Sequence, residues 1–379
     1  MKILQLCPYD ISVPGGVQTH VLELAKALKS KGHQVCVCTP EPRGDLDLED
    51  EWPECYYLPA SKRYKLWGTS IDVSYLNSSE RSKLLQWINN EQFDVVHFHT
   101  IWNPFFQYQL FKTLPVETKK VGTFHDTPPD RGVGKWIGAP LMKGAVRYFF
   151  PGLNHIVSVS LSQAAAMGYE GTLPANMHII PNGVALPQSD DSITREKNSK
   201  KIFRFLFIGR LEARKGVMDL LKAYRECCHS ELPLPIRLQI IGKGPLLEDV
   251  QNYMTKHSLP NIELLGELTN KEKSQRMYEA DVLIAPSIYG ESFGIVLLEA
   301  MIHKLKLIGY ANKGYLTLGR KYDEGCFVPP GDYLALAGLM KQQVLHPQKF
   351  ESLVNKGYDL AQEYTWDRIS ERILEVYHR

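Results

Sequence analysis

The chain has 379 residues, which is too long for one ordinary domain and fits two domains of about 180 residues. Its hydrophobic content of 44% supports sizeable cores, and its net charge of +2 gives no reason to expect a nucleic-acid-binding protein. The seven cysteines are an odd number without the spacing of a disulfide framework, which indicates a reducing, cytoplasmic compartment.

The N-terminal segment predicts a strand, a glycine turn, a helix and a second strand. MKILQLCP predicts a buried strand and not a signal peptide, and residues 17–30 show helical periodicity before the strand HQVCVCTP. This unit is typical of the phosphate-binding half of a Rossmann-like domain, although the turn lacks G-x-G-x-x-G. The adjacent Gly15 and Gly16 suit either a tight turn or a backbone that approaches a phosphate closely.

A stretch of basic and aromatic residues follows an acidic run over residues 41–54. SKRYKLWG interleaves Lys62, Arg63 and Lys65 with aromatic side chains, and a predicted helix over residues 79–90 adds Arg81 and Lys83. Such a mixture can bind an anionic headgroup or an anionic acceptor. An ordinary solvated surface loop is the alternative, and both interpretations stay open.

Two further predicted strands carry histidines at their carboxyl ends, where open α/β sheets bind ligands. FDVVHFHT contains His97 and His99, and the next strand is followed by His125. His-x-His on a strand could suit a metal, but no third ligand is spaced nearby, so we expect one histidine to face the site and the other to pack. MHIIPNGV begins with the last predicted strand of this half, and Asn182 lies in the turn that follows that strand.

A polar linker over residues 188–201 precedes a second series of strands and helices. FRFLFIGR, RLQIIGKGP, IELLGEL and ADVLIAP alternate with helical segments, which predicts a second doubly wound sheet. Arg210 and Lys215 follow its first strand, and such cations can hold phosphates in partly buried sites. We expect domains over residues 1–187 and 202–362 and a C-terminal helix over about 363–379.

The segment YGESFGIVLLEAM carries two carboxylates, Glu291 and Glu299, eight positions apart. We expect a turn and then a helix from about Phe293, whose unpaired N–H groups and positive dipole end would suit a diphosphate. The carboxylates could accept hydrogen bonds from sugar hydroxyls, or they could be solvated ends of an amphipathic helix, because short motifs match by chance. The backbone groups concerned belong to Ser292, Phe293, Gly294 and Ile295.

Four ordered segments resemble those of the family 4 retaining glycosyltransferases: PYDISVPGGVQTHVLELAKALKSKGHQV, FHD, IPNGV followed by FIGRLEARKG, and GESFGIVLLEAM. The similarity extends from Met1 to the C-terminus, and the first and last segments look most like those of phosphatidylinositol mannosyltransferases. The resemblance implies a GT-B fold, in which two Rossmann-like doubly wound domains face a central cleft and the last helix crosses back onto the first domain.

The resemblance also implies a reaction. A hexosyl group would move from a nucleotide-diphosphate sugar, GDP-mannose first and a UDP-hexose next, to a hydroxyl of a glycan, lipid or lipid-linked glycan, with retention. No D-x-D motif lies near a strand end, so we expect neither a catalytic metal nor a cofactor. We expect a cytoplasmic location that includes the inner face of a membrane. The resemblance implies that His125 lies beside the sugar ring, that Glu291 orients sugar hydroxyls and that Glu299 binds the ribose. Arg210, Lys215 and the Gly15–Gly16 backbone would stabilise the charge of the diphosphate. The sugar pocket would begin at Asn182.

The chain departs from the family pattern after the second glutamate. Lys304 stands where the family usually has glycine, and the loop over residues 311–320 is unusual, which leaves the donor open. Two other functions remain as alternatives: an epimerase of the same fold, which would keep the sugar on the nucleotide, and a sugar-nucleotide sensor without turnover.

Overall fold

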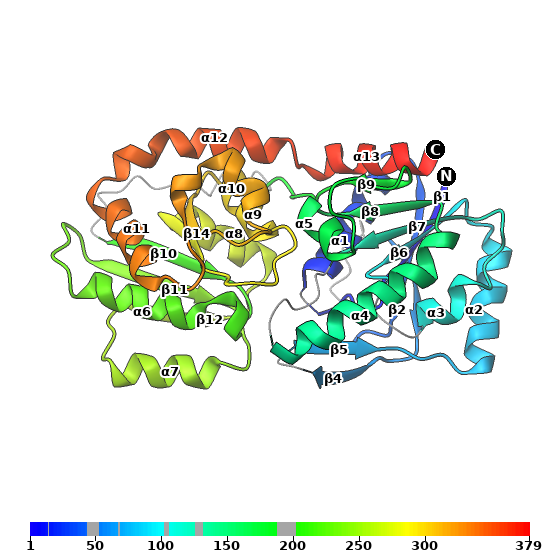
Figure 1. Cartoon of the computed structure of the whole chain (residues 1–379), viewed down its shortest axis with the longest axis horizontal. Coiled ribbons are helices and arrows are strands. Elements are labelled where there is room, and N and C mark those ends of the chain that lie inside the picture. The colour runs from blue at the N-terminus through cyan, green and yellow to red at the C-terminus, as the bar shows by residue number, and fades with distance from the viewer. Residues whose placement is uncertain (14, 44–52, 67–68, 102–105, 126–131, 188–201) are drawn as a thin grey trace. The chain divides into compact units, whose positions relative to one another are not determined.

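The computed structural model describes residues 1–13, 15–43, 53–66, 69–101, 106–125, 132–187 and 202–379. The chain forms two compact units (Figure 1). Unit 1 comprises Met1–Gly183 and Trp366–Arg379, and unit 2 comprises Val184–Thr365. Among the described residues, no helix combines the length and the apolarity that crossing a bilayer requires.

Unit 1 is built on a seven-stranded sheet with the order β3-β2-β1-β6-β7-β8-β9, and each neighbouring pair is parallel. Parallel sheets are covered on both faces, which explains why most of these strands read as continuous apolar runs. The strands are β1 Lys2–Leu6, β2 Gln34–Pro40, β3 Glu54–Leu58, β6 Val95–His99, β7 Lys119–Phe124, β8 His155–Ser158 and β9 Met177–Ile179.

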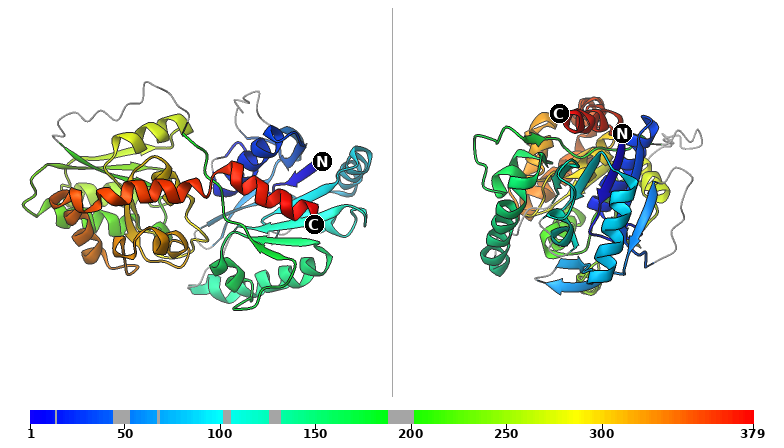
Figure 2. Two further views of the ribbon diagram at one scale, coloured as in Figure 1. Left: turned by 90° about the horizontal axis from the view of Figure 1, so that it is seen from above. Right: turned by 90° about the vertical axis from the view of Figure 1, so that its right-hand side faces the viewer.

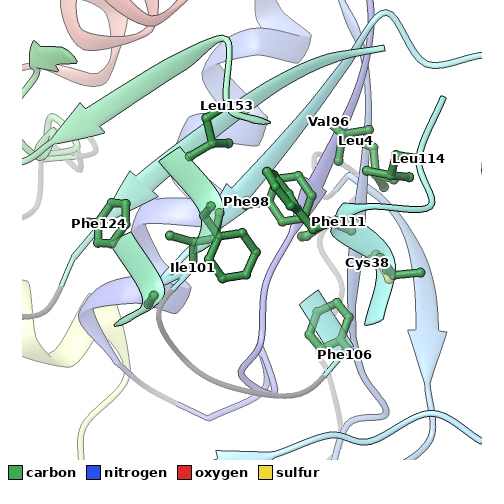
Figure 3. Packing of buried hydrophobic residues seen from close by; sticks show 14 of the residues in the cluster. Leu4, Cys38, Val96, Phe98, Ile101, Phe106, Phe111, Leu114, Phe124 and Leu153 are labelled. Carbon is green, nitrogen blue, oxygen red and sulfur yellow. The ribbon is translucent and has the colours of Figure 1, made fainter. Parts of the chain in front are cut away.

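Alternate residues of these strands enter two separate cores. Leu4, Val96 and Phe98 enter one core, where they pack with aromatic residues such as Phe111 from the covering helices (Figure 3). Ile3 and the corresponding residues of the adjacent strands enter the other core, which α1 and α13 cover. The helices of unit 1 are α1 Gly16–Ser30, α2 Ser78–Glu91, α3 Phe106–Phe111, α4 Gly132–Phe149, α5 Leu161–Ala166 and α13 Trp366–His378, with the 3₁₀ turn η1 Phe150–Gly152.

The C-terminal helix α13 belongs to unit 1, where it packs beside α1 close to the N-terminus (Figure 2). Ile369 and Ile373 on its inner face are 0% and 1% exposed. Lys31 at the end of α1 donates to Asp367 at 2.5 Å, and the Tyr377 hydroxyl lies 2.6 Å from Nδ1 of His97. The last residues of the chain therefore complete a core that its first residues begin.

Unit 2 is built on a six-stranded parallel sheet with the order β12-β11-β10-β13-β14-β15. Helices α6 and α12 lie on opposite sides of it (Figure 1). The strands are β10 Phe203–Ile208, β11 Ile236–Ile241, β12 Ile262–Gly266, β13 Val282–Ala285, β14 Lys306–Tyr310 and β15 Phe327–Val328. The helices are α6 Val217–Cys228, α7 Leu247–Lys256, α8 Asn270–Glu279, α9 Ile295–Ile302, α10 Leu316–Tyr322, α11 Tyr333–Leu345 and α12 Glu351–Gln362, with the 3₁₀ turns η2 Ala213–Lys215, η3 Glu324–Cys326 and η4 Pro347–Phe350.

The predicted fold class, two doubly wound α/β sheets, is confirmed, but two elements of unit 1 differ from the sequence analysis. The basic and aromatic stretch is not a loop: it forms β4 Lys62–Leu66, which pairs antiparallel with β5 Thr69–Val73. The acidic run was expected to be a loop as far as residue 54, yet Glu54 begins the edge strand β3. Both elements have polar exposed positions, so their apolar periodicity is weak, and pairing with a neighbouring strand is what makes them strands.

The docking of α13 can be tested with tryptophan fluorescence, because all six tryptophans of the sequence lie in unit 1. Ile369→Ala should lower the free energy of unfolding of unit 1 by about 2 to 5 kcal/mol, since it leaves a cavity in a closed core. The neighbouring exposed Arg368→Ala should change it by less than about 0.5 kcal/mol in the same urea titration. Equal effects of the two substitutions would contradict this packing.

Candidate active site

The N-terminus of α9 in unit 2 is shaped by glycine. Gly294 precedes the helix with φ 98°, and a Cβ atom there would lie 2.6 Å from the Tyr315 ring. No side chain caps the helix, and its first turn contains no acidic residue. The helix begins at Ile295, two residues later than the expected Phe293. The expected donor segment Ser292–Ile295 therefore lies at a helix N-terminus whose dipole favours an anion.

Glu291 lies just before this helix and forms a buried ion pair. Its Oε1 accepts a hydrogen bond from Lys215 Nζ at 2.5 Å and lies 3.8 Å from Nη1 of Arg214. The side chain of Glu291 is 11% exposed. Burial by itself would raise the pKa of Glu291, but the charges of Lys215 and Arg214 outweigh it and hold that pKa below its usual value. The carboxylate is therefore ionised at neutral pH and binds both cations.

The loop that carries these cations is fastened to the loop before α9. The backbone N–H of Ile288 donates to the Arg214 carbonyl at 2.7 Å, and Arg214 Nη1 donates to the Gly290 carbonyl at 3.2 Å. Gly216 has φ 70°, and a Cβ atom there would lie 2.0 Å from the Pro286 carbonyl oxygen. Only glycine permits this approach. Two chain segments that are about 75 residues apart in the sequence thus place their charges together by backbone contacts.

Arg214 and Tyr315 take part in this group although the sequence analysis did not select them. Arg214 Nε contacts Glu212 at 2.6 Å, so the guanidinium bridges two buried carboxylates. Tyr315 is 2% exposed, its hydroxyl lies 2.9 Å from Ser287 Oγ, and burial, followed by the charge of Glu291, raises its pKa well above the usual value. The string R-L-E-A-R-K-G offered Arg214 as a third cation, whereas nothing in the sequence indicated the contact of Tyr315.

Two further residues of unit 2 that were expected to bind the donor, Arg210 and Glu299, do not belong to the group around Glu291. Arg210 is exposed, and no contact with Glu291 is recorded among the described residues. Glu299 receives a hydrogen bond from Lys273 Nζ at 2.8 Å, and its side chain is 19% exposed. A ribose hydroxyl that binds Glu299 would therefore share it with Lys273.

The unusual segment after α9 is compatible with the fold. Lys304 has φ 55°, the left-handed conformation that glycine adopts most easily, which explains why a glycine is expected there. Gly314 packs against the Glu291 backbone so closely that a Cβ atom would lie 2.2 Å from its carbonyl oxygen. The segment thus contacts the candidate site directly.

In unit 1, histidines from three elements meet at the carboxyl ends of the strands. His99 ends β6, His125 follows β7 and His20 lies on α1. Nδ1 of His99 lies 3.1 Å from Nε2 of His125, and the His20 and His125 ring centroids are 4.5 Å apart. No third ligand stands near His-x-His in the sequence, but the fold brings His20 and His125 from distant segments to His99, whereas His97 is not part of this group. In the sequence, His20 stands in the segment GGVQTHV, shortly after the glycine turn that was expected to approach a phosphate.

The four buried histidines of this region are neutral. Burial lowers the pKa of His20 to about 4 and that of His97 to about 3, and it holds the pKa values of His99 and His125 well below the usual value. His97 lies against Thr123 and Tyr377 at 2.6 Å each, which is a packing role. The expected sugar-pocket residue Asn182 is buried and accepts a hydrogen bond from Nδ1 of His20 at 2.9 Å.

The N-terminus of α1 is also formed by glycines. Gly15 precedes the helix in an extended conformation, Gly16 is its first residue, and no side chain caps it. The first turn contains no acidic residue, so its dipole favours an anion. The approach of this backbone to a donor diphosphate stays a prediction.

The basic residues proposed for an acceptor or membrane face lie on two elements of unit 1. Lys62 on β4 is exposed, and so are Arg81 and Lys83 on α2. Arg63 and Lys65 lie on β4, but their side chains are outside the described part of the chain.

Comparisons with known proteins agree with the two-unit architecture. Residues 14–187 match the family model "Glycosyltransferase Family 4", and residues 189–360 match "Glycosyl transferases group 1". A phosphatidyl-myo-inositol mannosyltransferase of Mycobacterium leprae is 29% identical over 100% of this chain and 96% of its own length. The gpi3 subunit of the Schizosaccharomyces pombe phosphatidylinositol N-acetylglucosaminyltransferase is 24% identical over 96% of this chain and 77% of its own length.

Solved structures share the fold at lower identity. The Anabaena Alr3699/HepE complex with UDP and glucose has a TM-score of 0.79 at 18% identity, covering 100% of this chain and 99% of that chain. WaaG, a glycosyltransferase involved in lipopolysaccharide biosynthesis, has a TM-score of 0.68 at 17% identity and covers 99% of each chain.

Arg214→Ala should destabilise unit 2 because it leaves Glu212 buried without its cation and Glu291 with only Lys215. We expect a loss of about 2 to 4 kcal/mol, somewhat below the value for a fully buried pair because the Arg214 side chain is 32% exposed. Arg320→Ala is the matched control in the same unit, since its pair with Glu324 is 70% and 68% exposed and should contribute at most about 1 kcal/mol. Urea unfolding followed by circular dichroism measures both, and similar losses would refute the burial argument.

Proposed function

Because the chain belongs to the family 4 glycosyltransferases and has the GT-B fold, we propose that it transfers a hexosyl group from a nucleotide-diphosphate sugar to an acceptor hydroxyl with retention of configuration. The observation that carries the proposal is the group of Lys215, Arg214 and Glu291 beside the uncapped N-terminus of α9. It combines cations, a helix dipole and a carboxylate, which are the groups that a phosphorylated sugar requires.

The cations would act on the leaving diphosphate. Bond cleavage at the anomeric carbon leaves additional negative charge on the diphosphate, and fixed positive groups stabilise that charge more in the transition state than in the ground state. Lys215 and Arg214 are held in place by Glu291 before any donor binds, so little reorganisation is needed at the moment of reaction. Arg210, which is exposed, would join them only when the donor is bound.

Glu291 would have two partners in succession. Without donor it binds Lys215; with donor, the diphosphate competes for that ammonium and Glu291 can accept hydrogen bonds from hydroxyls of the sugar. The carboxylate suits this exchange because its pKa is held low and it remains an acceptor at neutral pH. His125, a neutral imidazole, would hydrogen-bond the sugar ring, and the diphosphate would accept the proton of the acceptor hydroxyl in a front-face attack.

We infer that no metal ion takes part in this transfer. The D-x-D segment of the sequence, at residues 45–47, lies in the acidic run over residues 41–54, and the charge of the diphosphate is matched by protein cations and helix dipoles. None of these residues is an evident covalent nucleophile, which agrees with the front-face mechanism.

GDP-mannose is the first candidate donor. The support is the similarity along the whole chain to phosphatidyl-myo-inositol mannosyltransferases, whereas the 18% identity to the UDP-bound Alr3699/HepE concerns the fold alone. The contact of Tyr315 and Gly314 with Glu291 lies in the segment that departs from the family pattern, so a UDP-hexose is the second candidate.

Lys215→Ala should reduce kcat by about 100-fold or more, because it removes a cation that the developing diphosphate charge requires. The experiment incubates the protein with radiolabelled GDP-mannose or UDP-hexoses and a glycan or lipid acceptor. Lys222→Ala on the solvent side of α6 is the control and should retain activity. Label that stays on the nucleotide as an epimer would identify an epimerase, and donor binding without any conversion would identify a sensor.

A lipid or lipid-linked acceptor is the acceptor class that the relatives and the basic residues Lys62, Arg63 and Lys65 support together. The protein should then co-sediment with anionic liposomes at low salt, since each cation near such a surface contributes about 1 kcal/mol. Replacing these three residues by Ser should release the protein without weakening donor binding. Replacing Lys256, Lys349 and Lys356, which are exposed in unit 2, is the charge-matched control. A wild-type protein that ignores anionic liposomes would favour a soluble acceptor.

A further inference from the structure

Three histidines of unit 1 form a group with the composition of a metal site. One ring nitrogen of each of His20, His99 and His125 lies within 4.8 Å of the others, and all three residues are buried. In a tetrahedral zinc site with Zn–N distances of about 2.0–2.1 Å, ligand nitrogens are roughly 3.3 Å apart. His99 Nδ1 and His125 Nε2 are 3.1 Å apart, in a hydrogen bond that an ion bound by both nitrogens would replace, and a ring nitrogen of His20 lies within 4.8 Å of them.

One nitrogen of the group has a lone pair that nothing in the described residues satisfies. His20 Nε2 is buried and has no hydrogen-bond partner there; His99 Nε2 also lacks one, but it is not the nitrogen that faces His125. A buried polar nitrogen without a partner costs about 1–3 kcal/mol, so such an atom needs an explanation. A ligand that accepts electron pairs from imidazole nitrogens would provide one.

The surroundings of His20 match those of a metal-binding imidazole. Its Nδ1 donates to the Asn182 side-chain oxygen, which fixes the tautomer with the lone pair on Nε2. Metal-ligating histidines generally donate their second nitrogen to an oxygen in this way. Helix α1 and strand β6 carry His20 and His99, and His125 directly follows the end of β7.

We propose that His20, His99 and His125 bind one divalent transition-metal ion of the zinc class. Three neutral imidazoles suit zinc, cobalt, nickel and copper, whereas magnesium and calcium prefer oxygen ligands. The fourth position would be open to water. This proposal goes beyond the transfer reaction, in which no metal takes part: the ion would occupy one ring nitrogen of His125 and thereby inhibit the enzyme.

The chain contains a second pair of histidines that serves as a control. His155 Nδ1 lies 3.2 Å from His178 Nε2, nearly the same spacing as in the proposed site, but both residues are only partly buried, and no third ligand accompanies them among the described residues. If a close pair of histidines sufficed, this pair would bind the metal equally well.

The test is direct metal binding to the full-length, EDTA-treated protein. Co²⁺ should bind one ion per chain with the intense visible absorption of tetrahedral coordination, and Zn²⁺ should displace it. His99→Gln and His20→Gln should each weaken binding by about 100-fold or more, and Asn182→Ala, which alters only the orientation of His20, by about 10-fold. His178→Gln should leave the affinity unchanged. Circular dichroism checks that each variant is folded, and His20→Gln keeps the test valid if the fully buried His99 cannot be replaced.

Three outcomes would overturn the proposal: no binding of Co²⁺ or Zn²⁺ at stoichiometric concentrations, binding that survives both His20→Gln and His99→Gln, or binding that His178→Gln abolishes. In the transfer assay, wild-type activity should persist in EDTA, fall on addition of Zn²⁺ and return on chelation. Because metal binding is measured without substrate, failure of this site and failure of the proposed transfer reaction are distinguishable.

Discussion

The structure of unit 2 depends on one electrostatic requirement: the buried carboxylate of Glu291 must have cations beside it. An ionised carboxylate in a poorly solvated site is strongly destabilised unless it is paired and hydrogen-bonded. Lys215 and Arg214 meet that need, and the backbone contacts around Gly216 and Ile288 bring them within reach. The same cations are what a diphosphate would bind. The cations of this group are thus stabilised by their own carboxylate while no ligand is bound.

The two units offer different chemistry to a ligand. Unit 2 presents fixed charges beside a helix N-terminus, which suits an anion. Unit 1 presents imidazoles that burial keeps neutral, since His20 has a pKa of about 4 and the pKa values of His99 and His125 are lower than usual. Neutral imidazoles donate to and accept from hydroxyls without drawing in an anion. Unit 2 thus has the groups that suit an anion, and unit 1 has a set of groups that suits neutral hydroxyls.

Periodicity and turn chemistry predicted the parallel strands and the segment from β13 to α9, because buried strands and glycine turns leave local signals. The β4–β5 ribbon was not predicted, since its amphipathic pattern is short and its stability comes from pairing. The candidate site was predicted in part. Glu291 and Lys215 stood out by motif. Tyr315 and His20 join the site only through tertiary contacts, with partners that are 24 or more positions away in the sequence. No local pattern can report such contacts.

The histidine group shows how one arrangement can suit two ligands. Lone pairs that accept hydrogen bonds from sugar hydroxyls are the same lone pairs that bind zinc, so a site built for a neutral polyol has intrinsic affinity for soft cations. Neither a carboxylate nor a thiolate belongs to the group among the described residues, so a bound dication would keep most of its charge in a buried place. That cost limits the affinity to a level at which a chelator or a cellular zinc buffer competes. The proposed ion would therefore compete with substrate hydroxyls for these imidazoles, and it would do so only when the metal is in excess.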